Sequence, residues 1–162
     1  MDDIKDASIP LISYKNNLRS EGIYIPSLKI TLGRSLARAN YLINNMIDAF
    51  NTKVNFNDNS YEVSVYDLKS RINYKNNAIN IKIEGKIDSP DSDDLTELKE
   101  IVIKDLNDNI LELINNEREN NYNISNIINY IYLKTREVNY DVYKKADINV
   151  NITLKEEEKD NY

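Results

Sequence analysis

The sequence predicts an α+β fold in which a mostly antiparallel sheet is packed by helices. Apolar residues alternate with polar ones over residues 61–87, which is typical of a long, half-buried hairpin. An apolar stripe at three- and four-residue spacing follows over residues 94–119, which indicates a long amphipathic helix. A further alternating run at 147–154 predicts a strand that joins the hairpin sheet, so the elements are grouped rather than regularly alternating.

The first third of the chain contains short elements. The apolar run 9–12 holds Pro10, which marks it as an edge strand or a turn. Residues 22–26 and 28–32 each show the alternation of a short strand.

A helix is expected next, over residues 35–50. Its apolar residues recur at helical spacing, and Ser35 is a suitable N-cap. Residues 51–60 are expected to form a polar loop, with Val54 and Phe56 as a possible short strand.

Two details are expected within the long hairpin. Asn76 and Asn77 form its turn, because asparagine tolerates positive φ. Gly85 interrupts an alternating run and indicates a bulge or a bend. The residues expected to face the core are Ile79, Ile81, Ile83 and Ile87.

The helix over 94–119 has a clear start signal. Asp94 and Glu97 have the spacing of a capping box, with Asp94 in the serine role. The positions of its apolar stripe are Leu95, Leu98, Val102, Leu106, Ile110, Leu113 and Ile114.

The last third is expected to hold another helix over 123–136 and a short helical turn over 138–145, before the final strand. The length of 162 residues suits one domain, which we place at residues 1–155. Residues 156–162 form a charged tail that is expected to fray.

Composition excludes several classes of function. The net charge of −6 disfavours nucleic-acid binding, which needs a basic face to replace counterions. Basic residues gather only at Arg19, Lys29, Arg34 and Arg38, and we interpret them as a solvated helix face. No stretch of the sequence approaches the length of a membrane span.

Enzymatic chemistry is restricted in the same way. The chain has no Cys and no His, so thiolate zinc sites, cysteine nucleophiles and Ser-His-Asp triads are excluded. Its three glycines are far apart and cannot build a phosphate-binding loop. We therefore predict that the chain is not an enzyme and uses no cofactor or metal.

Two rival hypotheses use the acidic residues. The loop 88–94 could bind Ca²⁺ through its carboxylates, although Pro90 intervenes and the central glycine of an EF-hand is absent. A pair of carboxylates could also support hydrolase chemistry, but no pair stands out in the sequence.

Tyrosine is frequent, with twelve residues, and gathers in the last third of the chain. A tyrosine can bury its ring and keep its hydroxyl wet, which suits protein interfaces. Use as a core and boundary aromatic is at least as good an interpretation. The tyrosines of the predicted interaction surface are Tyr122, Tyr130, Tyr132, Tyr140 and Tyr143.

The pattern from about Gly22 onward resembles the C-terminal domain of the Ger(x)C family, the C subunits of bacterial spore germinant receptors. The resemblance rests on segments in one order: 32–36, 63–72, 79–87, 95–116, 122–125, 130–134 and 148–152. Asn123 stands where the family has Asp, which adds Asn123 to the predicted interaction surface. The family's Phe-Gly pair is replaced by Ser125 and Asn126, and Tyr140 is a stand-in for its Trp.

The resemblance implies a non-enzymatic structural or interaction domain of a germinant receptor. Such a domain works beside the integral membrane subunits on the outer face of the inner spore membrane and supports nutrient-triggered germination. Family members carry a signal peptide and a lipid-modified Cys. The acidic start Met1–Asp6 predicts no signal peptide here. The spore-membrane location thus assumes a lipoprotein signal upstream of this sequence, and the location expected otherwise is cytoplasmic.

Overall fold

The computed structural model describes residues 8–92 except 15–17, and residues 94–156. The elements are β1 (Ile9–Tyr14), β2 (Leu18–Ile25), β3 (Ile30–Gly33), α1 (Arg34–Ile43), β4 (Phe50–Phe56), β5 (Asn59–Lys75), β6 (Ala78–Asp88), α2 (Thr96–Asn120), α3 (Ile127–Thr135), α4 (Tyr140–Lys145) and β7 (Asp147–Glu156). The predicted α+β class is confirmed, and so are the short strands expected in the first third.

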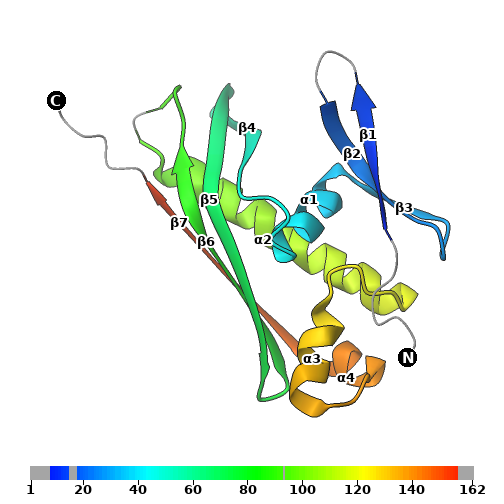
Figure 1. Cartoon of the computed structure of the whole chain (residues 1–162). Helices are drawn as coiled ribbons and strands as arrows, with labels where there is room; N and C mark the ends of the chain where they lie inside the picture. The colour runs from blue at the N-terminus through cyan, green and yellow to red at the C-terminus, as the bar shows by residue number, and fades with distance from the viewer. Residues whose placement is uncertain (1–7, 15–17, 93, 157–162) are drawn as a thin grey trace.

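Two sheets lie on either side of the helices α1 and α2 (Figure 1). The smaller sheet has the order β1-β2-β3 and is antiparallel. The larger sheet has the order β4-β5-β6-β7 and is antiparallel except for the parallel pair β6–β7. Helices α3 and α4 pack together at one end of the larger sheet, beside the C-terminal end of α2 (Figure 1).

The hairpin of β5 and β6 is the expected one. Asn76 and Asn77 form its turn with φ of 54° and 57°, so each adopts the left-handed conformation that asparagine tolerates. Gly85 lies opposite a bulge in β5, where the register shifts between Tyr66 and Lys69. A Cβ on Gly85 would lie 2.8 Å from the Leu68 side chain and 3.1 Å from the Tyr66 carbonyl oxygen, so a larger residue there would displace Leu68 from the bulge.

The core lies between the larger sheet and α2. The four isoleucines expected on the inner face of β6 are buried, as are all the positions of the predicted helical stripe of α2. The cluster continues to the smaller sheet through Ile23, Ile25 and Leu32. Burial of this apolar surface is the main stabilising contribution to the fold.

The helix predicted at 35–50 is shorter than expected. α1 ends at Ile43, and its N-cap is Gly33 rather than Ser35. The apolar spacing continues to Phe50, but Asn45 takes the left-handed conformation (φ 53°) and turns the chain. Phe50 then begins β4.

The predicted loop at 51–60 is instead a second hairpin. Val54 and Phe56 belong to the strand β4, as foreseen, but that strand is longer and pairs with β5. Asn57 and Asp58 form the turn, with φ of 48° and 62°. They use the same left-handed conformation as the Asn76–Asn77 turn.

The start of α2 is close to the expected one. Asp94 Oδ1 accepts a hydrogen bond from the Thr96 N–H at 3.0 Å, so its carboxylate binds a free donor of the first turn. The capping box predicted for Asp94 and Glu97 is wrong, because the N-cap is Leu95, whose side chain makes no capping hydrogen bond.

The helix predicted at 123–136 begins later. Asn126 adopts φ 66°, and α3 covers only Ile127–Thr135. Ile124 lies before the helix, in a segment that is itself buried. The predicted helical turn and final strand match α4 and β7. Glu156, the first residue of the predicted tail, belongs to β7, and 157–162 lie outside the described residues.

The turn after α1 holds β5 where β4 no longer reaches it. Asn45 Nδ2 donates to the Ser70 carbonyl at 2.9 Å, and its Oδ1 accepts from the Ser70 N–H at 2.7 Å. The Leu68 N–H donates to the Asp48 carbonyl at 2.9 Å. One asparagine side chain therefore replaces a neighbouring strand.

Asn45→Ala should lower the free energy of unfolding by about 1.5 kcal/mol, because it removes both bonds to Ser70 and places alanine at positive φ. Urea denaturation measures the loss. Asn55→Ala, at an exposed position of β4, is the control and should change stability by no more than about 0.5 kcal/mol. Equal stabilities of the two variants would contradict this role for Asn45.

Candidate functional site

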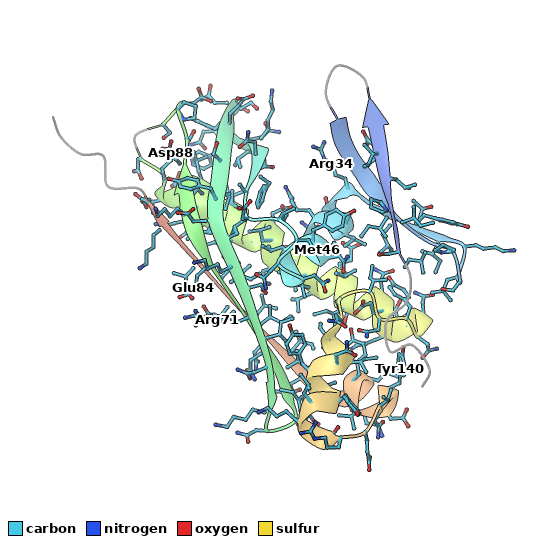
Figure 2. All side chains as sticks on the ribbon, in the orientation of Figure 1. Arg34, Met46, Arg71, Glu84, Asp88 and Tyr140 are labelled. Atoms are coloured by element: carbon cyan, nitrogen blue, oxygen red, sulfur yellow. The ribbon has the colours of Figure 1, made fainter. Side chains whose placement is uncertain are left out.

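A groove of about 790 Å³ opens between α1 and β4. Figure 2 shows Arg34 at the start of α1 and Met46 at the turn after this helix. The groove is lined by α1, by the chain that leads from it into β4, and by Glu62 of β5. It is the candidate functional site.

The α1 wall of the groove carries Arg34, Arg38 and Tyr41. Their spacing of four and three residues places them on one face of the helix. Arg38 donates to Asp105 Oδ2 on α2 at 2.8 Å, and its guanidinium lies 4.6 Å from the centre of the Phe50 ring. The Arg38 side chain is only 20% exposed, so these partners hold it in a fixed position.

The surroundings of Arg38 also change its pKa. Burial lowers the pKa of Arg38 from its usual value, Asp105 opposes this change, and the positive charge of Arg34 lowers the pKa further. The repulsion between the two arginines favours an anionic group near both of them.

The opposite wall is formed by residues 49–53, which follow one another in the chain. Successive side chains of a strand point to opposite faces, so a consecutive run borders the groove with its backbone edge. β4 is an end strand of its sheet. Its outer edge therefore has no strand partner among the described residues.

The hydrogen bonds of Glu62 show which groups lie on that edge. Its N–H donates to Asp91 Oδ2 at 2.9 Å and its carbonyl accepts from Ser89 Oγ at 2.6 Å, so neither points to its β4 partner, Lys53. Glu62 and Lys53 therefore form a non-hydrogen-bonded antiparallel pair, in which the N–H and C=O of each residue point away from the other strand. The N–H and C=O of Lys53, and two residues earlier of Asn51, therefore point from β4 to its outer edge.

The groove is positively charged, although the whole chain has a net charge of −6. Arg34, Arg38 and Lys53 face it, with Glu62 as the one acidic lining residue. Lys53 and Glu62 are 3.8 Å apart and both exposed, so this ion pair is weak. The interpretation of the basic residues as a solvated helix face is wrong for Arg19 in β2, for Lys29 in the turn before β3, and for the largely buried Arg38; it holds for Arg34. The spacing of Arg34, Arg38 and Tyr41 was the available signal, but the Lys53 wall required the missed strand β4.

The tyrosines predicted as an interaction surface are divided by the structure. Tyr122 and Tyr143 are 1% and 0% exposed, and Asn123 is 0% exposed. For these three residues a surface role is wrong in this conformation, because they fill the interior between α2, α3 and α4. Tyr130, Tyr132 and Tyr140 are half-buried, so for them the surface stays a prediction (Figure 2 labels Tyr140). Asn123 Oδ1 accepts from the Ile128 N–H in the first turn of α3 at 3.4 Å.

The buried tyrosines surround a buried carboxylate, Glu117 on α2, which is 0% exposed. Its Oε1 accepts from the Ser125 N–H and its Oε2 from Ser125 Oγ, both at 2.6 Å. Oε2 also accepts from the Tyr143 hydroxyl at 2.5 Å. The neighbouring Tyr122 hydroxyl is buried and has no hydrogen-bond partner among the described residues.

Burial raises the pKa of Glu117 to about 7, despite the hydrogen bonds from Ser125 and Tyr143 that favour its charged form. Burial also raises the pKa of Tyr143 and Tyr122 above its usual value, and the charge of Glu117 adds to both shifts. A carboxyl with such a pKa is suited to proton transfer, but Glu117, Ser125 and Tyr143 are all closed to solvent. Their hydrogen bonds join α2 to the segment before α3 and to α4, and a substrate cannot reach these buried groups.

The acidic loop 88–94 has structural partners of its own. Ser89 and Asp91 bind the backbone of Glu62, and Asp94 binds the first turn of α2. Among the described residues, which omit Asp93, no group of three acidic side chains is placed to hold a metal ion. The Ca²⁺ hypothesis stays a prediction that no feature of the described loop favours.

Comparisons with known proteins identify the fold. No family model matches the chain, and a search of curated protein sequences finds no match. Among solved structures, the chain is similar to the crystal structure of the GerBC protein, with a TM-score of 0.71 and 13% sequence identity. The similarity covers 95% of this chain and 57% of the GerBC chain.

The chain therefore has a GerBC-like fold, and the resemblance seen in the sequence is confirmed at the level of the fold. It spans a little over half of the length of GerBC. In the part of the chain that the structure describes, no helix combines the length and the apolar character that crossing a membrane requires.

The Glu117 cluster predicts a specific pH dependence of stability. Because the pKa of Glu117 is near 7 in the folded state and about 4.5 in the unfolded state, the folded chain binds this proton more tightly. The resulting stability is complete below about pH 4.5 and is lost as pH rises to about 7, by about 3 kcal/mol. Glu117→Gln should remove this loss, because glutamine does not titrate.

Urea denaturation of both proteins at several pH values between about 4.5 and 7.5 measures the effect. The free energy of unfolding of the wild type, minus that of the Gln variant, should fall as pH rises. Glu117→Ala should lower stability by about 3 kcal/mol even at low pH, because Ser125 and Tyr143 lose their acceptor. If the two stability profiles run parallel with pH, Glu117 is not the group that causes the pH dependence.

Proposed function

We propose that this chain is a non-enzymatic interaction domain of a spore germinant receptor. In this role it supports nutrient-triggered germination beside the integral membrane subunits of the receptor, on the outer face of the inner spore membrane. The observation that carries the proposal is the similarity to GerBC over 95% of the chain, together with the Ger(x)C-like pattern in its sequence.

The geometry of the chain supports an interaction role. The groove between α1 and β4 offers a strand edge, aromatic side chains and fixed positive charge, which are features of protein-recognition surfaces. Glu117, whose pKa is raised to about 7 and would suit a general acid or base, is buried in the interior and cannot reach a substrate. The domain would therefore position other receptor components rather than transform a germinant.

A genetic experiment tests the proposal in the spore-forming bacterium that encodes the chain. Deletion of the coding sequence should strongly reduce germination in response to the nutrient that the receptor detects, and germination by a receptor-independent trigger should be unchanged. An epitope-tagged chain should also co-purify from detergent-solubilised spore membranes with two multi-span proteins. An unchanged nutrient response, or a tagged chain that co-purifies with neither subunit, would overturn the proposal.

A further inference from the structure

The two walls of the groove present different groups, which together favour a polypeptide partner. Its β4 wall presents the outward backbone groups of Asn51 and Lys53, which only another polypeptide backbone can pair with in strand geometry. Its α1 wall presents Arg34 and Arg38, and Lys53 adds a third cation. Asp105 and Glu62 balance part of this charge, and Arg34 supplies the exposed part of it. Tyr41 and Phe50 also line the groove, and the Phe50 ring lies under the Arg38 guanidinium.

We propose that the groove binds an extended, acidic segment of a partner protein, which adds to the larger sheet as a strand beside β4. The backbone of the segment pairs with Asn51 and Lys53, and its carboxylates approach Arg34 and Arg38. The inference deepens the interaction role proposed above, on which it rests, by naming the chemistry of the partner.

The dimensions and the charges suit this occupant. β4 has seven residues and is about 23 Å long, which is sufficient for a short added strand. Arg38 is already fixed by Asp105 and Phe50, so binding needs little further ordering of this side chain. Arg34 is exposed, and its repulsion with Arg38 is relieved by a carboxylate between them.

The other end strand of the sheet, β7, differs in character. The exposed residues in its middle are Asn149, Asn151 and Thr153, which carry no charge. Asn149 donates to Asn80 on β6 at 3.1 Å, so its side chain continues an amide pairing within the sheet. Of the two end strands of the larger sheet, β4 is therefore the one that combines an outer backbone edge with a charge that selects an acidic segment.

The test uses the whole chain and a labelled peptide of about seven residues, with alternating Glu and Val. Fluorescence anisotropy should show saturable binding that weakens as salt is raised, and a peptide with Lys in place of Glu should not bind. A single-stranded oligonucleotide of similar charge serves as the rival polyanion. Absence of peptide binding up to about 1 mM, or preference for the oligonucleotide, would overturn the proposal.

Two variants locate the binding. Arg34→Glu should weaken the peptide at least about fivefold, because it reverses an exposed charge of the groove. Lys75→Glu makes the same change of charge at the far end of the β5–β6 hairpin (Figure 1), and it should leave the affinity unchanged. Equal affinities of the two variants would place the peptide elsewhere.

The strand geometry has its own test. Asn51→Pro removes an outward N–H of β4 without removing a β4–β5 bond, so the fold should persist while peptide affinity falls at least about tenfold. Asn51→Ala keeps this N–H and should bind like the wild type. Thermal melting checks that both variants are folded. If a folded Asn51→Pro variant binds normally, the peptide does not add as a strand.

The outcome is separable from that of the germination experiment. Peptide binding at the groove with an unchanged nutrient response would leave the recognition chemistry intact and remove the receptor role. Loss of germination on deletion, with no acidic peptide bound, would support the receptor role and remove the acidic partner.

Discussion

The buried Glu117 carboxylate is the interaction on which the second half of the fold depends. It ties α2 to the 122–126 segment through Ser125 and to α4 through Tyr143. Arg118, the next residue of α2, donates to the Ala146 carbonyl at 2.6 Å. Because β7 begins directly after Ala146, these contacts fix where the last strand enters the sheet. From there β7 pairs with β6 in parallel and forms the end strand of the larger sheet.

The sequence predicted those elements in which buried and exposed residues alternate with one constant period. The alternation of isoleucines in β6 and the apolar stripe of α2 each have one period and one buried face, so their patterns were sufficient. It failed where a single asparagine overrides a pattern. Asn45 ends α1 although Ile47 and Phe50 keep helical spacing, and Asn126 delays α3 although Ile124 has the right spacing. The conformation of Asn45 is held by bonds to Ser70, 25 residues away, and periodicity does not record such contacts.

The candidate site was less predictable than the fold, for two physical reasons. A tyrosine is compatible with a surface and with a core, and only the position of a partner such as Glu117 decides that Tyr143 is buried. The groove needs α1 and β4, which are separated by a turn that the sequence pattern hides. Arg34 and Arg38 alone describe a polar helix face, and they become part of a site only when Lys53 lies opposite.

The two arginines of the groove have different physical roles, which determines what each can reveal about binding. Arg38 is paired with Asp105 and stacked on Phe50, so its removal would leave a carboxylate without its partner and loosen the junction of α1 with α2. A loss of affinity in an Arg38 variant would therefore mix recognition with folding. Arg34 is exposed, so its replacement tests recognition without disturbing the packing of α1. In the proposed complex, the contribution of Arg34 to affinity should be sensitive to salt and act mainly on the association rate, whereas the fixed guanidinium of Arg38 should set the position of the bound carboxylate.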